Sequence, residues 1–148
     1  EELNRLLSDP STFVAATAII RGELPGSIIY SDEVCVVLLT LTPHTRGHAM
    51  VIPREELSAW TDAEDELLAH LMSVAKRVGR AQLAEFGGQR SGLMIQGYGV
   101  DHLHVHVFPT SSIDDFDERE RPNASAADLA DVAELLTARL LRDEADDV

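Results

Sequence analysis

The residue types that could perform chemistry gather between Asp101 and Pro109, which read Asp-His-Leu-His-Val-His-Val-Phe-Pro. Three of the six histidines of the chain occupy alternate positions there: His102, His104 and His106. Successive side chains of a strand point to opposite faces, so this spacing predicts a face of imidazoles and a face of branched apolar residues. A neutral imidazole offers a nucleophilic nitrogen and a protonated one offers donors, with the change near neutral pH. The row therefore favours phosphate chemistry.

The geometry of a strand leaves two other interpretations of this row open. Same-face neighbours are about 6.6 Å apart along the backbone, which places His102 and His106 about 13 Å apart. A zinc ion holds its nitrogens at about 2.0 to 2.1 Å, so one ion could bind two adjacent histidines but not easily all three. An elongated anion could contact all three. A two-histidine metal site and a surface strand without function remain alternatives, while the favoured phosphate chemistry is expected to need no metal or other cofactor.

The composition bounds the class of protein. A chain of 148 residues, 45% apolar and 26% charged, is expected to form one globular domain with a core of its own. Its 12 basic and 26 acidic residues give a net charge of −14, which argues against nonspecific binding to DNA, RNA or an anionic membrane. We expect neither nucleic acid nor a membrane as a partner, and an anionic substrate must be held by local donors.

The single cysteine and the apolar pattern bear on where in the cell the protein is expected. Cys35 is the only cysteine, which excludes an intrachain disulfide framework and fits a reducing cytoplasm. It lies in an apolar run and is expected to be a small buried side chain rather than a catalytic thiol. No apolar stretch approaches twenty residues and no signal peptide is visible, so we expect a cytoplasmic protein. His70, outside the row, is expected to be structural or solvent-facing.

Hydrophobic periodicity and turn residues predict five strands and three helices. The strands are expected at residues 28–30, 34–39, 49–52 and 93–96 and through the histidines. A short helix is expected near the N-terminus, and a long one starts at a capping box of Thr61 and Glu64 and ends near Phe86. After an acidic extended loop at residues 111–123, Ser125 is expected to cap a last helix.

Three motifs resemble one known family. They are Arg21-Gly-Glu-Leu-Pro-Gly, the turn Thr45-Arg-Gly-His48 followed by Met50-Val-Ile-Pro53, and His102-Leu-His-Val-His106-Val107-Phe108. The last motif satisfies at every position the pattern His-φ-His-φ-His-φ-φ, in which φ is apolar. Over roughly residues 13–109 the chain is similar to the histidine triad (HIT) superfamily, in its nucleotide-binding branch.

The resemblance implies a fold and an assembly. It implies an α+β fold with a five-stranded antiparallel sheet, one long helix and a short N-terminal helix, followed here by a C-terminal helical extension. Residues 1–110 would form the HIT-like nucleotide-binding domain, with its core at about 13–109, and residues 111–148 would add an acidic loop and a helix to the same domain. The family also implies a homodimer in which the long helix and the fourth strand of each subunit meet across a two-fold axis.

The resemblance also implies an activity. Family members release a nucleoside monophosphate from phosphoramidates, dinucleoside polyphosphates or related esters, so the expected enzyme is a nucleotide hydrolase or phosphoramidase acting on a purine nucleotide and releasing AMP. His104 matches the nucleophile that becomes a nucleotidyl-histidine. His102 and His106 match the flanking members that orient the phosphate and help the leaving group depart, and His48 matches a buried fourth histidine bonded to the triad.

The resemblance places the nucleoside in an apolar pocket. The matching apolar positions are Ala15, Ala16, Ile19, Leu38, Leu41 and Met50, and core packing is the alternative for each of them. Gln96 takes the place of an asparagine near the phosphate. Two positions depart from the family: Thr40 stands where an aspartate often binds the ribose, and Gly99 lacks the side chain that would assist the leaving group. These departures leave open a second hypothesis, a nucleotide-binding regulatory module that turns over slowly or not at all.

Overall fold

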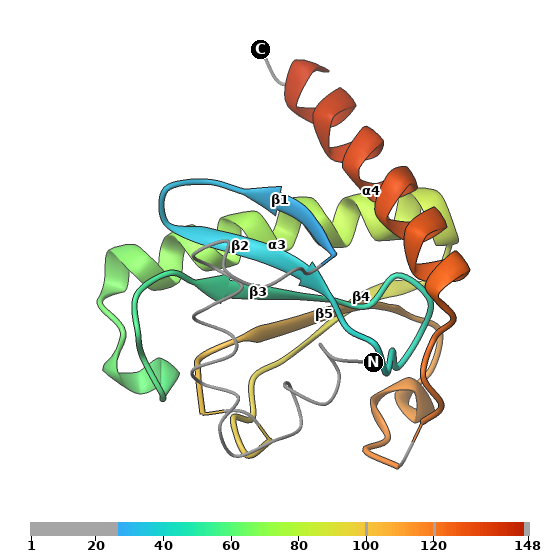
Figure 1. The fold of residues 1–148 in the computed structure, drawn as a ribbon. Helices are drawn as coiled ribbons and strands as arrows, with labels where there is room; N and C mark the ends of the chain where they lie inside the picture. Colours follow the sequence, from blue (N-terminus) through green and yellow to red (C-terminus); the bar gives the residue numbers. More distant parts are fainter. Residues whose placement is uncertain (1–26, 100, 120, 147–148) are drawn as a thin grey trace.

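The computed structural model describes residues 27–99, 101–119 and 121–146. Its strands are β1 Ile28–Ser31, β2 Cys35–Leu39, β3 Ala49–Pro53, β4 Arg90–Met94 and β5 Val105–Thr110. Its helices are α3 Asp65–Phe86 and α4 Ala126–Asp146, with short 3-10 turns η1 Trp60–Asp62 and η2 Ile113–Phe116. The strands form one antiparallel sheet in the order β1-β2-β3-β5-β4, with both helices against it (Figure 1). The five-stranded α+β fold with a long helix and a C-terminal helix is confirmed.

The alternation of side chains decides which face of the sheet the helices cover. In β2, Cys35, Val37 and Leu39 belong to one buried core cluster. The same cluster takes its helical members from α3 and α4; they are Leu71, Val74, Ala75, Val78, Ala81, Val132, Leu136 and Leu140. Because neighbouring strand residues point to opposite faces, Leu38 lies on the face away from the helices, although it is fully buried as well. That second face carries the candidate site.

One buried amide ties α3 to two segments of the sheet. Gln82 is fully buried, and its Nε2 donates to the carbonyl oxygens of Gly47 at 2.8 Å and Val107 at 2.9 Å. Gly47 precedes His48, and Val107 follows His106. Buried carbonyl groups need a hydrogen-bond partner. Gln82 therefore fixes both histidine-bearing segments against the helix.

The start of the long helix differs from the sequence prediction. Thr61 and Glu64 do not form a capping box, because Thr61 lies in η1 and Glu64 precedes α3 with an extended backbone and no side-chain cap. The helix begins at Asp65, where Asp65 and Glu66 place negative charge in the first turn, a favourable arrangement at a helix N-terminus. It ends as predicted at Gly87, whose φ of 80° suits glycine.

The fourth strand and the acidic stretch differ in part from the prediction, whereas the start of α4 agrees with it. The strand predicted at 93–96 lies at β4, because its backbone pairs with β5 from Arg90 opposite Thr110 onward. Backbone pairing at a sheet edge does not require apolar side chains, so the polar start of β4 gave no sequence signal. The acidic stretch predicted as an extended loop contains η2, which is capped by Ser112. Ser125 caps α4 as predicted, since its Oγ accepts from the N–H of Asp128 at 3.0 Å.

Some predictions fall on other parts of the chain. The short N-terminal helix and the pocket residues Ala15, Ala16 and Ile19 lie outside the described residues. Within the described residues, no helix combines the length and the apolar character needed to cross a membrane. Cys35 is fully buried, as predicted. Burial, together with the charge of Asp32, raises the pKa of its thiol to about 12, so it is protonated at neutral pH.

Candidate active site

The histidines lie on the same face of the sheet as two of the predicted nucleoside-binding residues. Met50 of β3 pairs with Leu38 of β2 on one side and with His106 of β5 on the other. Directly opposed residues of antiparallel strands share a face, so these three side chains form one row across the sheet. Leu38 and Met50 are both buried. The row brings the apolar positions beside the triad.

Only part of the histidine motif lies within a regular strand. β5 begins at Val105, so His102 and His104 lie in the segment that precedes it. The N–H of Leu103 donates to the carbonyl oxygen of Leu57 at 2.7 Å, so the backbone of this segment bonds to the chain beyond the end of β3. Leu103 still joins the core cluster. The predicted alternation holds, but the prediction of one strand through all three histidines is wrong in its extent.

A chain of hydrogen bonds fixes the tautomers of His48 and His106. The backbone N–H of His44 donates to Nδ1 of His48 at 3.0 Å. Because a backbone N–H only donates, neutral His48 carries its proton on Nε2. That nitrogen lies 2.9 Å from Nδ1 of His106, which must accept. His106 therefore carries its own proton on Nε2, where it is a donor.

A separate bond gives His104 the opposite tautomer. Its Nδ1 lies 2.7 Å from the carbonyl oxygen of His102. Because a carbonyl only accepts, Nδ1 carries the proton, and Nε2 of the neutral ring holds a lone pair. The ring centroids of His104 and His106 are 4.7 Å apart. The two rings thus present a nucleophilic nitrogen next to a donor N–H.

Burial keeps these imidazoles neutral. It is the main cause that lowers the pKa of His104 and that lowers the pKa of His48 well below its usual range, with a further contribution to His48 from His106. Burial, reinforced by His104, lowers the pKa of His106 to about 3. A histidine in water has a pKa of about 6.5. All three rings are therefore neutral at neutral pH, as their tautomers require.

His102 contributes its backbone to the site more than its ring. The ring is 1% exposed, and its Nε2 donates to the carbonyl oxygen of Pro53 at 2.9 Å. The carbonyl of His102, in contrast, holds Nδ1 of His104. The structure brings the rings of His48, His104 and His106 together and turns the ring of His102 to the end of β3.

The same tautomers bear on the alternative of a metal bound by two triad histidines. A metal ion needs a lone pair from each ligating ring. Nδ1 of His106 already accepts from His48, and its Nε2 carries the proton. Only Nε2 of His104 offers a lone pair in this pair of rings, so the geometry favours a nucleophile over a metal ligand.

A cavity of about 210 Å³ opens beside His104. Residues from the chain before α3 and after β4 line it; they are Ser58, Ala59, Trp60, Thr61, Ile95, Gln96, Gly97, Leu103 and His104. Gln96, predicted to lie near the phosphate, shares this cavity with His104. Sequence reasoning missed the wall at residues 58–61, because it assigned Thr61 to a helix cap. The signal that could have found it is the aromatic and hydroxyl pair Trp60-Thr61 in the short connection between β3 and α3.

Thr40 and Leu41 follow β2 and are both buried. Thr40 lies next to the triad segment, because its N–H donates to the carbonyl oxygen of His48 at 3.3 Å. Its Oγ1 accepts from the N–H of Thr42 at 3.3 Å, so the hydroxyl can still donate to a ligand. The carbonyl of Leu41 accepts from the N–H of Ala124 at 2.8 Å. The chain before α4 is thus attached to the loop that leads into His48.

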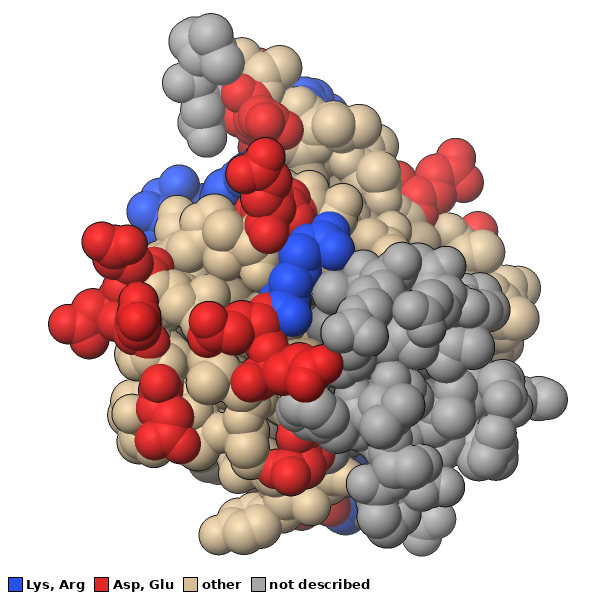
Figure 2. All heavy atoms as spheres, turned by 60° about the vertical axis from the view of Figure 1, so that its left-hand side comes forward, with Lys and Arg blue, Asp and Glu red and all other residues tan. Residues whose placement is uncertain are grey.

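The surface charge agrees with a site built from neutral donors. Acidic side chains outnumber basic ones on the face shown in Figure 2, and the net charge of the chain is −14. Such a field repels polyanions. In such a field an anionic ligand needs short-range hydrogen bonds, and the N–H of His106 is one donor that the triad offers.

Comparisons with known protein sequences agree with the geometry. The model of the HIT domain family matches residues 21–113. An uncharacterized HIT-like protein of Mycobacterium tuberculosis is 34% identical over 97 residues, which cover 62% of this chain and 67% of that protein. An uncharacterized HIT-like protein of Synechocystis is 36% identical over 98 residues, which cover 60% of this chain and 82% of that protein.

Solved structures share the fold over most of its length. A zinc-bound histidine triad family protein from Mycobacterium smegmatis superposes with a TM-score of 0.77 at 29% identity, covering 89% of this chain and 96% of that chain. A hypothetical histidine triad nucleotide-binding protein from Sulfolobus tokodaii superposes with a TM-score of 0.73 at 26% identity, covering 88% of this chain and 92% of that chain.

Proposed function

The chain belongs to the HIT domain family, and we propose that it is a nucleotide hydrolase in which His104 is the covalent nucleophile. The substrate is a nucleoside monophosphate, AMP in the simplest case, joined through its phosphorus to an amine, a second nucleotide or an alcohol. The observation that carries the proposal is the lone pair on Nε2 of His104, held beside the N–H of His106 and against a cavity.

The first step transfers the nucleotide to the protein. The lone pair on Nε2 of His104 attacks the α-phosphorus, a P–N bond forms, and the bond from phosphorus to the leaving group breaks. The leaving group departs with the bonding electrons and takes a proton from solvent. Nδ1 of His104 keeps its proton and donates it to the carbonyl oxygen of His102, which stabilises the positive ring of the adduct. A covalent intermediate divides one difficult displacement into two easier ones.

The second step releases the nucleotide. Water attacks the phosphorus, the P–N bond breaks, and its electron pair returns to Nε2 of His104. The water loses its proton to solvent, and a nucleoside monophosphate leaves. In both steps the N–H of His106 donates to a nonbridging oxygen, and one well-placed donor of this kind is worth about 3 to 4 kcal/mol in a transition state.

The two sides of His104 suit the two parts of the substrate. We place the nucleoside, with a purine base, against Leu38 and Met50, together with Leu41 and Ile19, and its ribose at the hydroxyl of Thr40. We place the leaving group in the cavity that contains Gln96. That cavity is smaller than the roughly 300 to 1,000 Å³ of a whole small-molecule site, which suits part of a substrate. His102 would act through its carbonyl.

A regulatory module that binds a nucleotide and turns over slowly is the second candidate. It is favoured by Gly99, where an added Cβ would meet no atom within 4 Å, so no neighbouring described side chain takes the place of the missing one. Thr40 adds to it, because a hydroxyl binds a ribose more weakly than a carboxylate does. Gly99 would lower the rate of turnover and Thr40 the affinity for the nucleotide, but neither residue changes the proposed nucleophile, His104.

We also propose a homodimer through α3 and β4. β4 is an edge strand of the sheet, and Leu93 of β4 and Met72 of α3 are 39% and 48% exposed. An edge strand presents backbone groups that a second copy could pair. Sedimentation equilibrium would give twice the chain mass, and Leu93→Lys would give the monomer. The cytoplasmic location and the domain division at residue 110 stay predictions.

Pre-steady-state kinetics test the proposed function. The p-nitrophenyl ester of AMP is mixed in excess with the protein, and nitrophenolate is followed by absorbance while AMP is followed by chromatography. A hydrolase gives steady release of both products, with a burst of nitrophenolate if the second step is slower. Binding of AMP without release of either product would favour the module, and neither binding nor release with adenine or guanine nucleotides would refute both.

A further inference from the structure

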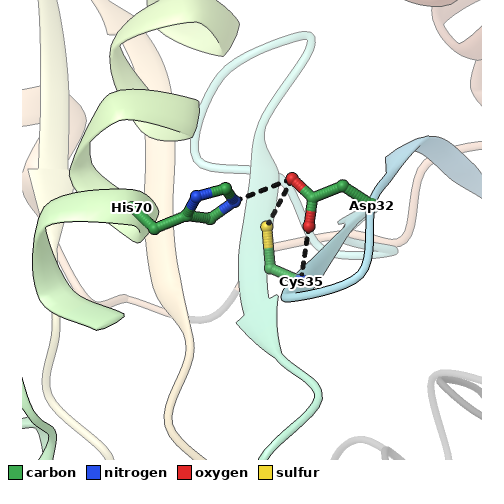
Figure 3. Close-up of side chains that lie close together, drawn as sticks. All are labelled: Asp32, Cys35 and His70. Carbon is green, nitrogen blue, oxygen red and sulfur yellow. Dashed lines mark hydrogen bonds and ion pairs between the residues drawn. The ribbon is translucent and has the colours of Figure 1, made fainter. Parts of the chain in front are cut away.

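Three side chains that could bind a metal lie close together where the β1–β2 turn meets α3: Asp32, Cys35 and His70 (Figure 3). One ligand atom from each lies within 4.8 Å of the other two. Nε2 of His70 is 2.7 Å and Sγ of Cys35 is 3.9 Å from Oδ2 of Asp32. We propose that this cluster, named here the Asp32–Cys35–His70 site, binds a zinc ion.

The donor set selects the metal. Thiolate, imidazole and carboxylate together suit zinc, whereas calcium and magnesium prefer oxygen ligands alone. Zinc bonds of about 2.0 to 2.3 Å in a tetrahedral arrangement place the ligand atoms about 3.3 to 3.6 Å from one another. Nε2 of His70 must therefore move away from Oδ2 of Asp32 by about 0.6 Å, and Sγ of Cys35 must approach Oδ2 by about 0.3 Å. Sγ of Cys35 and Nε2 of His70, which lie within 4.8 Å of each other, must also close to about 3.5 Å.

The carboxylate of Asp32 is already oriented by neighbouring donors. The hydroxyl of Tyr30 donates to Oδ2 at 2.7 Å, and the N–H groups of Val34 and Cys35 donate to Oδ1 at 2.8 Å each. Metal-binding carboxylates are held by hydrogen bonds of this kind, which lower the cost of ordering the site. The turn thus presents a fixed oxygen ligand.

The cluster reaches solvent through His70 and Asp32 and not through Cys35. The side chains of His70 and Asp32 are 37% and 23% exposed, while Cys35 is fully buried. Zinc sites with three protein ligands keep a fourth position for water, which would reach the ion from the solvent beside His70 and Asp32. Cys35 releases its proton to solvent on binding, so a thiolate and a carboxylate balance the two charges of the ion. The acidic surface in Figure 2 attracts cations.

Cobalt titration of the whole chain tests the proposal, because Cys35 is the only cysteine. Any thiolate-to-cobalt charge-transfer absorption therefore reports this site alone. We expect the absorption to saturate at one ion per chain and to disappear when zinc is added. If the Asp32–His70 contact only ties the turn to α3, no such absorption develops at saturating cobalt, and the proposal is wrong.

Variants separate ligation from general metal affinity. His70→Gln and Asp32→Asn should each weaken zinc binding by at least about 100-fold, and Tyr30→Phe by about tenfold, as for a residue that orients a ligand. His104→Ala removes a histidine of the candidate active site and should leave the cobalt absorption unchanged. Circular dichroism confirms that each variant is folded before titration. Unchanged zinc affinity in a folded His70→Gln variant would overturn the assignment.

Discussion

Nε2 of His48 lies 2.9 Å from Nδ1 of His106, and this contact carries a proton assignment from the backbone into the candidate active site. The N–H of His44 sets Nδ1 of His48 as an acceptor. His106 must then carry its own proton on Nε2. In the proposed mechanism, His48 would therefore act on the phosphate through His106, without contacting it.

Replacing His48 should remove the contact that keeps the proton of His106 on Nε2. In His48→Phe, which keeps an aromatic ring of similar bulk, His106 is free to move its proton to Nδ1 and lose the donor to the phosphate. We expect the rate of adduct formation to fall by about 100-fold while AMP binding measured by calorimetry stays within a few-fold. His44→Ala is the matched control, because it keeps the backbone N–H, and its loss should be far smaller. Equal losses in the two variants would contradict the tautomer chain.

Removing the buried amide of Gln82 should weaken the fold and loosen the site together. Gln82→Leu leaves the carbonyls of Gly47 and Val107 without their buried donor, which should cost about 2 to 4 kcal/mol of unfolding free energy. Urea denaturation measures this. Gln89→Leu, at an exposed position just beyond α3, is the control and should change stability by less than about 0.5 kcal/mol. Similar values for both variants would show that the two bonds do not hold the sheet to α3.

Adding a hydroxyl at Gly99 should speed departure of the leaving group. An added Cβ there meets no atom of the described residues within 4 Å, and Gly99 is not among the described glycines with a positive φ. Gly99→Ser should therefore fold normally and raise the single-turnover rate with an adenosine phosphoramidate several-fold. Gly99→Ala separates the hydroxyl from the methylene and should leave the rate unchanged. If Gly99→Ser is no faster than Gly99→Ala, the missing hydroxyl at position 99 does not limit the release of the leaving group.

The neutral imidazoles should make the fold sensitive to acid. An unfolded histidine takes up a proton near pH 6.5, whereas burial and the neighbouring His104 lower the pKa of His106 in the fold to about 3. Below pH 6.5 the unfolded state therefore binds more protons than the folded state. As the pH is lowered, the free energy of unfolding decreases by up to about 1.4 kcal/mol per pH unit for this ring. Between pH 6.5 and 5 the wild type should lose up to about 2 kcal/mol more than His106→Asn. Parallel losses in urea denaturation would contradict a neutral His106.

Features carried by local patterns could be predicted from the sequence. The alternation through His104 and His106 predicts that these two rings share a face, and the short connections predict that β2 and β3 are neighbours. Gly87 and Ser125 mark helix ends through local backbone and hydrogen-bond preferences. These features depend on residues a few positions apart, which is the range that periodicity reports.

Features that depend on particular backbone groups or on contacts between distant segments could not be predicted from the sequence. The tautomer of His48 depends on a backbone N–H, which every residue but proline has, and so no residue type signals it. The burial of the ring of His102 depends on the carbonyl of Pro53, 49 positions away. The Asp32–Cys35–His70 site joins a turn to a helix 38 positions beyond it. Only the packing of α3 on the sheet brings His70 to Asp32 and Cys35.

Intact-mass spectrometry of the protein after mixing with an adenosine phosphoramidate tests the central claim most directly. The reaction is quenched without acid, because a phosphorus–nitrogen bond to histidine is acid-labile. The account predicts a mass increase of one adenylyl group on the wild type, located on His104 by peptide mapping and absent from His104→Ala. An adduct that persists in His104→Ala, or AMP release by the wild type with no adduct even at the shortest times, would contradict it.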